Sequence, residues 1–181
     1  TNGKKDLCCA LKSRQIVDAL RPDPELTGQV YESSHLTGHR FAPTALLLPT
    51  GQMYGRLTTE TAKEALASAW NGELIPDYLR GRTALPGWAQ AAEIAVRKHA
   101  QVLGVDALDV VTLRNQKPVP TSVIGAYDAA AKIQVRHVDG RSWNVAVQQI
   151  DVPARKVSCS GQPESGISWQ STSVTDAERW H

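Results

Sequence analysis

Four side chains near the start of this chain could hold a metal. They are two adjacent cysteines, Cys8 and Cys9, and two histidines four residues apart, His35 and His39. Thiolate and imidazole are the side chains that bind borderline-soft metal ions and iron–sulfur clusters. Of the chain's five histidines and three cysteines, these four fall within the first 39 of 181 residues. The clustering predicts a metal centre near the N-terminus.

The histidine segment alone does not identify the metal. Two histidines at this spacing also arise by chance, and histidines in polar loops usually bind only solvent. The His-Glu-x-x-His pattern of zinc proteases is absent because Leu36 and Thr37 fill the middle. Gly38 permits a tight loop that turns both imidazoles toward one point. The segment alone is therefore only a candidate for metal binding, and it contains no general base for metal-assisted hydrolysis.

The cysteine pair is expected to supply one ligand to this centre. Neighbouring residues diverge by about 100° on a helix or point to opposite faces of a strand, so two adjacent thiolates rarely bind the same ion. Buried free cysteines also pack as small hydrophobic groups. The third cysteine, Cys159, is a weaker candidate because it lies far along the chain. The chain opens at Thr1 without an initiator methionine, so we expect an upstream segment that could carry the remaining ligand.

Composition narrows the class of protein. The net charge of +2, from 20 basic and 18 acidic residues, gives no basic face for nucleic acid. No apolar run approaches the roughly 18–20 residues of a membrane span. Three cysteines make a poor disulfide framework, which favours a reducing compartment, and we expect a cytoplasmic protein. At 41% hydrophobic residues the chain can bury a substantial core.

The first part of the chain mixes helices with short strands. Apolar spacing and turn residues predict helices over 9–20 and 60–71, and strands over 29–32, 45–48 and 53–57, with an irregular segment over 73–84. The last two strands form a hairpin around Pro49-Thr50-Gly51-Gln52. Gly55 within a strand indicates a bulge or a close approach of another backbone.

The second part becomes mostly β. A long helix over 86–103 and a strand over 109–113 precede Pro118 and Pro120. Beyond these prolines, two alternating segments flank Asp139-Gly140 and predict a hairpin over 132–138 and 141–147. Further strands are expected over 150–152 and 156–159. We divide the chain into a first domain over 1–118, an appended β-hairpin region over 119–171 and a polar tail over 172–181.

One run of residues carries a family resemblance. The segments Lys4-Lys5-Asp6-Leu7-Cys8-Cys9-Ala10, Ser34-His35-Leu36-Thr37-Gly38-His39-Arg40-Phe41-Ala42-Pro43 and Tyr54-Gly55-Arg56-Leu57 resemble the sucrase/ferredoxin-like family of thioredoxin-like [2Fe–2S] proteins. The match is strong over about residues 1–58 and loose over 85–115. The resemblance implies a mixed α/β fold: a thioredoxin-like ferredoxin domain that lacks its first strand here, with an appended C-terminal β region.

The same resemblance implies a cofactor and its ligands. Cys9 matches the last cysteine of the family's cysteine segment, while His35 and His39 match its histidine ligands. The family's first cysteine falls before Thr1, so Cys8 or an upstream residue must replace it, and Asn2 stands where the family has histidine. The implied function is one-electron transfer by a [2Fe–2S] cluster to a reductase or acceptor protein, coupled to proton uptake through the imidazoles. An electron carrier needs no substrate pocket.

Two other functions use the same residues or the same fold. The ligands could instead hold zinc, or the domain could be a cluster-free binding or assembly module that acts through protein–protein contacts. Among the tryptophans, Trp70 and Trp88 are expected in the core, and Trp180 is the candidate for a partner contact. His99 and His137 are expected on solvated faces. Thioredoxin-like thiol exchange is disfavoured because the chain has no Cys-x-x-Cys motif.

Overall fold

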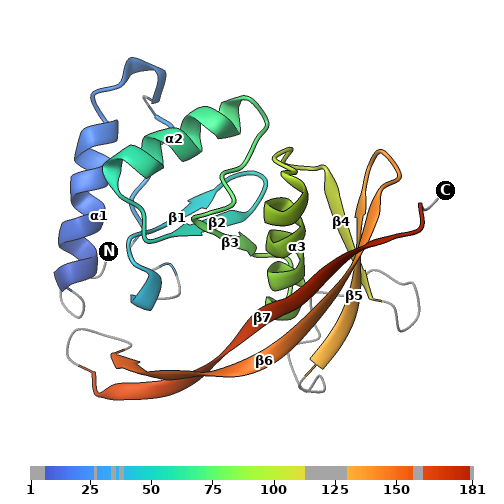
Figure 1. The fold of residues 1–181 in the computed structure, drawn as a ribbon. Coiled ribbons are helices and arrows are strands. Elements are labelled where there is room, and N and C mark those ends of the chain that lie inside the picture. Colours follow the sequence, from blue (N-terminus) through green and yellow to red (C-terminus); the bar gives the residue numbers. More distant parts are fainter. Residues whose placement is uncertain are drawn as a thin grey trace.

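The computed structural model of the chain describes residues 7–26, 28–33, 36, 39–112, 130–156 and 161–179. Within these residues, three α-helices and two antiparallel sheets make a mixed α/β fold (Figure 1). The elements are α1 (Leu7–Leu20), the 3₁₀ turns η1 (Pro24–Leu26) and η2 (His39–Phe41), β1 (Thr44–Leu47), β2 (Gln52–Gly55), α2 (Thr59–Trp70), β3 (Leu79–Arg82), α3 (Gly87–Ala100), β4 (Leu108–Thr112), β5 (Ala130–His137), β6 (Ser142–Lys156) and β7 (Pro163–Ala177). The mixed α/β class predicted from the sequence is confirmed.

The first sheet has the strand order β1-β2-β3, with every pair antiparallel. Its first two strands form the expected hairpin, in which Leu46 faces Met53. The third strand corrects the expectation that residues 73–84 are irregular. Gly81 faces Met53 at a register shift and adopts a φ of 108°, and a Cβ atom there would lie 2.6 Å from Gln90 Cβ. A breaker residue in the sequence thus marks close packing between β3 and α3.

Helices α1 and α2 pack with the first sheet around a small apolar core. Its fully buried members are Ile16, Leu20, Leu26, Tyr54, Leu57, Ala62, Ala65, Leu74, Leu79 and Val105. Helix α2 begins where expected, because the Thr58 side chain accepts a hydrogen bond from the Thr61 backbone while Thr61 Oγ1 accepts one from the Thr58 backbone. The prediction that Trp70 lies in the core is wrong. Trp70 is the last residue of α2, and 54% of its surface is exposed.

The second sheet has the order β4-β5-β6-β7 and supports the larger core. Alternate residues of the hairpin strands, such as Ile133, Val135, Val145 and Val147, are almost completely buried, as a period of two requires. Helix α3 packs on this sheet with Trp88, Ala89, Ala92 and Val96, whose spacing places them on one face. The same helix contacts β3, so it joins the two sheets (Figure 1). Trp88 is buried as predicted.

The C-terminal part forms a longer ribbon than the sequence predicted. Strands β6 and β7 each contain 15 residues and pair along their length, with register shifts after Ala146 and Val152. Residues 172–177, which were placed in a polar tail, therefore belong to β7. The tail reading failed because Ser, Thr and Gln side chains give a solvated ribbon no apolar alternation. Strand β4, placed in the first domain, pairs with β5 of the second sheet. The proposed boundary at 118 remains a prediction.

A buried ion network holds α3 to its neighbours. Glu93 and Arg97 are completely buried, and Arg97 Nη2 donates to Glu93 Oε1 at 2.9 Å. Arg82 of β3 donates to the other carboxylate oxygen at 3.0 Å. The remaining donors of Arg97 bind the carbonyl oxygens of Val102, Gly104 and Val105. Each buried charge is thereby paired and hydrogen-bonded, as burial in a low-dielectric core demands.

Candidate metal centre and its basic surroundings

The two cysteines lie in helix α1, whose described part runs from Leu7 to Leu20. The side chains of both cysteines lie outside the described atoms, so their directions are not assigned.

The two histidines fall in differently described segments. His35 lies outside the described residues, whereas His39 begins the 3₁₀ turn η2, with its side chain outside the described atoms. This turn continues through Ala42 and a cis Pro43 into β1. The backbone therefore places His39 five residues before the first strand, close in sequence to the edge of the first sheet.

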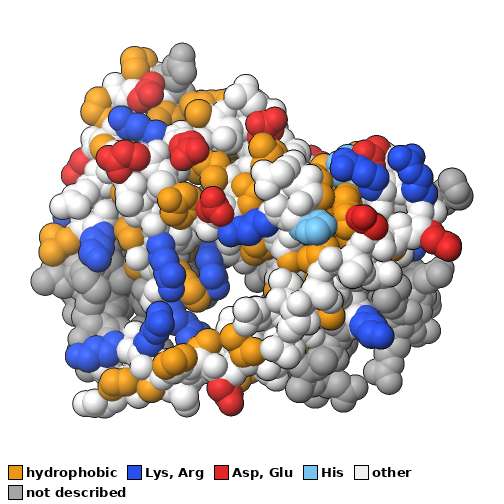
Figure 2. Space-filling model, in the orientation of Figure 1, with side chains coloured by type: hydrophobic (Ala, Val, Ile, Leu, Met, Phe, Trp, Pro, Cys, Tyr) orange, Lys and Arg blue, Asp and Glu red, His pale blue; other side chains and the backbone are white. Residues whose placement is uncertain are grey.

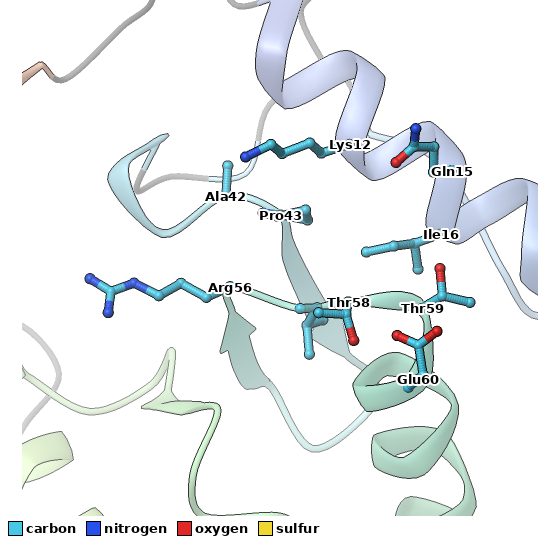
Figure 3. Close-up of a pocket in the computed structure, with 10 residues that line it drawn as sticks. Lys12, Gln15, Ile16, Ala42, Pro43, Arg56, Thr58, Thr59 and Glu60 are labelled. Atoms are coloured by element: carbon cyan, nitrogen blue, oxygen red, sulfur yellow. The ribbon is translucent and has the colours of Figure 1, made fainter.

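A cavity of about 540 Å³ brings the cysteine helix and the segment after His39 together. Lys12 lies one helical turn after Cys9 and Ala42 three residues after His39, and both line this cavity. Its other side is the segment from Arg56 to Glu60, which leads into α2. Figure 3 shows the side chains of Lys12 and Arg56 extending in the same direction, on the side where Ala42 lies. The two segments that carry candidate ligands are thus neighbours.

Three arginine side chains surround the aromatic ring of Phe41, the second residue after His39. The guanidinium carbon of Arg80 lies 3.5 Å from the centroid of the Phe41 ring, and those of Arg40 and Arg56 each lie 5.5 Å from it. Desolvation lowers the pKa of Arg80, and the neighbouring charges of Arg56 and Arg40 lower it further. Figure 2 shows lysine and arginine side chains gathered on this face, around the hollow beside the β6–β7 ribbon.

The backbone holds these arginines in place. Arg56 follows β2 in a left-handed conformation, with φ of 58°, and its amide donates to the Phe41 carbonyl at 2.6 Å. A Cβ atom on Gly55 would lie 3.1 Å from Phe41, which confirms the close approach predicted for this glycine. From the ribbon, Gly166 approaches Arg40 so closely that a Cβ atom would lie 3.0 Å from Nη1. Three elements of the chain therefore meet at this cluster.

A larger cavity of about 860 Å³ adjoins the first one, and Ile16, Ala42, Pro43 and Leu57 line both. It is lined by α1, α2, β1 and residues 28–33, and most of its lining side chains are apolar. Residues 29–32, expected to form a strand, line this cavity but form no strand in the structure, which corrects that expectation.

The described atoms contain no set of three metal-ligating side chains, and none of the described helices has the length and apolar character needed to cross a bilayer. The side chains of Cys8, Cys9, His35 and His39 lie outside the described atoms. Of the remaining histidines, His99 is exposed as expected. The prediction that His137 is exposed is wrong. Its side chain is only 14% exposed, and its Nδ1 lies 2.8 Å from Asp139 Oδ1.

Comparison with known proteins finds a family model that matches the N-terminal part of the chain, somewhat less than half of its length. Residues 1–81 match the family described as sucrase/ferredoxin-like, which confirms the resemblance read from the cysteine and histidine segments. The match covers α1, the histidine segment, the first hairpin and α2, and it extends to β3. No curated protein and no solved structure matches the chain.

The sequence reading missed most of the arginine cluster. Arg40 stood out because it follows His39, but Arg80 lay in a segment read as irregular, and nothing in its sequence context linked it to Phe41. Arg56 belongs to the Tyr54-Gly55-Arg56-Leu57 block that carried part of the resemblance. A basic residue after a strand glycine was the available signal, and only the fold reveals its neighbours.

Proposed function

We propose that the protein is a one-electron carrier that binds a [2Fe–2S] cluster through Cys9, His35 and His39, with Cys8 or an upstream residue as the remaining ligand. The observation that carries the proposal is the cavity shared by the cysteine helix and the segment after His39. The family match over residues 1–81 supports it independently. The donor set fits the cofactor, because thiolates and imidazoles are established ligands of two-iron clusters.

The cluster, when bound, supplies reversible one-electron transfer. The residues of this chain set the conditions for it. Neutral imidazoles in place of thiolates make the centre less negative, which raises its reduction potential. The positive charges of Arg40, Arg56 and Arg80 lie beside η2 and act in the same direction.

The proposal includes a proton held by the imidazoles. A histidine that binds iron through one ring nitrogen keeps a proton on the other, and reduction makes that proton harder to lose. Electron uptake is then accompanied by proton uptake, so the reduction potential falls as pH rises. A potential that stays constant between about pH 6 and 10 would remove this part of the proposal while leaving the electron carrier intact. The partner is a reductase or acceptor protein of a reducing compartment such as the cytoplasm.

The first experiment is a visible absorption spectrum of protein made anaerobically from its complete gene, before and after dithionite, with iron, sulfide and zinc measured in the same sample. We expect charge-transfer bands that bleach on reduction and about two irons per chain. Colourless protein that contains stoichiometric zinc would replace the proposal with a zinc site, and metal-free protein would favour a binding module.

Matched variants test the assignment of ligands. C9S and H39A should lose most of the iron and the visible bands. H99A is the control for the histidine change, because His99 is exposed in the last turn of α3, outside both candidate ligand segments. Equal iron content in H39A and H99A protein would contradict the assignment of His39.

A further inference from the structure

Within the part of the chain that the structure describes, the arginine cluster formed by Arg40, Arg56 and Arg80 around Phe41 lacks a counter-charge. Among the described residues, none of the three lies within 4.0 Å of a carboxylate oxygen, and none forms a side-chain hydrogen bond. Other arginines behave differently: Arg21, Arg82 and Arg141 each pair with a carboxylate. The cluster is therefore a local excess of positive charge in a chain of almost balanced charge.

The fold holds these cations together against their repulsion. Desolvation and the charges of its two neighbours disfavour the charged form of Arg80, which is why its pKa falls. The guanidinium groups share one aromatic ring, whose faces offer only a weak cation–π attraction of about 0.5–1 kcal/mol at exposed sites. Such an arrangement gains most from an anion that neutralises several guanidinium groups at once.

The cluster is also pre-organised. The left-handed backbone of Arg56 and its hydrogen bond to the Phe41 carbonyl fix the end of β2 against η2. Arg80 comes from the neighbouring strand β3, and Gly166 of the ribbon confines Arg40. Positive φ at a residue other than glycine is costly and often marks a binding site. The donors are thus held in position before a ligand arrives.

We propose that Arg40, Arg56 and Arg80 form a binding site for a phosphate-type oxyanion, either inorganic phosphate or the phosphoryl group of a small molecule. Each guanidinium presents several N–H donors in a planar fork that matches phosphate oxygens. Three forks offer more donors than the two oxygens of one carboxylate can accept, whereas a phosphate presents more oxygens to them. Guanidinium groups already occupy the surroundings of the Phe41 ring, so the site recognises an anionic group and does not stack a nucleobase on that ring. The proposal does not depend on the presence of a metal cluster.

Titration with inorganic phosphate at constant ionic strength, balanced with chloride, tests the site. Calorimetry and the arginine Nε–Hε resonances should show saturable binding of one phosphate per chain. R80Q and R56Q should each weaken it by about tenfold or more, because a hydrogen bond to a charged group is lost. A phosphate monoester such as glycerol phosphate is titrated in parallel, and tighter binding than inorganic phosphate would assign the site to a phosphorylated small molecule.

R141Q is the matched control. Arg141 also lies 5.5 Å from an aromatic centroid, that of Trp143, but its charge is neutralised by Asp139. Its replacement should leave phosphate affinity unchanged, and circular dichroism should show that all variants fold. R80K should bind phosphate with intermediate affinity, because it keeps the charge and loses the fork. If R80Q fails to fold, R56Q decides the question.

Three results would overturn the proposal: no saturable phosphate binding, equal affinity in the wild type and in R56Q and R80Q, or a loss of affinity in R141Q as large as in R80Q. Binding of an oligoglutamate peptide without binding of phosphate would also overturn it, because the cluster would then be a docking surface for an acidic protein.

Discussion

Glu93 and Arg97 form an ion pair with no solvent exposure, and Arg97 Nη2 lies 2.9 Å from Glu93 Oε1. The pair sits where α3 meets both sheets, so the two halves of the fold depend on it. We predict that E93Q lowers the free energy of unfolding by about 3–5 kcal/mol, because the change leaves a buried arginine without its counter-charge. Urea unfolding monitored by tryptophan fluorescence measures the change.

D77N is the control for this prediction. Asp77 pairs with Lys98 at 3.0 Å, but both side chains are well exposed. Such a surface pair contributes about 0–1 kcal/mol. An E93Q variant no less stable than D77N would show that the network around Arg97 relaxes to admit water.

The cavity beside α1 predicts that α2 tolerates a larger side chain at Ala65. Ala65 of α2 is buried but lines the cavity of about 860 Å³. A65L should therefore keep or raise the melting temperature, since its side chain fills empty space. A92L is the matched change in the core under the second sheet, where Ala92 has no exposed surface. Overpacking there should cost about 1–3 kcal/mol. Equal destabilisation by the two changes would mean that the cavity is closed in solution.

Gly81 tests the contact between β3 and α3. G81A combines a φ of 108° with a Cβ atom 2.6 Å from Gln90 Cβ, so strain and steric overlap add. Gly72 has a φ of 71° and no atom within 4 Å of an added Cβ, so G72A isolates the backbone strain of about 1–2 kcal/mol. We predict that G81A is the more destabilised variant in thermal melts. G81A protein as stable as G72A protein would exclude tight packing at this point.

Tyr54 predicts a loss of stability at alkaline pH. Desolvation raises its pKa above the ordinary value near 10, and this outweighs the hydrogen bond from the Ile75 amide to its hydroxyl oxygen. The folded state therefore keeps a proton that the unfolded state releases, so stability is complete below about pH 10 and falls as pH rises beyond it. Chemical unfolding at pH 8 and pH 11 should show a smaller loss for Y54F than for the wild type. An equal loss would assign alkaline unfolding to other groups.

Local patterns predicted the elements that depend on local chemistry. The Asp139-Gly140 turn, the capping threonines of α2 and the apolar spacing of α3 each specify a structure within a few residues, and those elements formed close to their expected bounds. Strands β3 and β7 were missed because their pairing is decided by distant partners, not by their own polar composition. Trp70 was misplaced for a related reason: side-chain type does not reveal which helix face is covered.

The residues of the candidate site likewise differ in whether the sequence alone could predict them. Cys9, His35 and His39 could be selected from the sequence because residue type alone restricts what binds metals. The arginine cluster could not, because Arg80 reaches Phe41 only after β3 pairs with β2. Charges that come together through pairing of distant strands leave no trace in a linear sequence.

The number of residues in the β6–β7 ribbon determines how far the second sheet extends. Among the described residues, strand β5 pairs with β6 as far as Gln148, and β7 continues to pair with β6 beyond that point, up to the contact of Gly166 with Arg40. Side chains alternate between faces with a period of two. Removal of two facing residues from each strand would therefore shorten the arm without exchanging its faces. The length of the ribbon therefore determines whether Gly166 reaches Arg40 in the N-terminal half of the molecule.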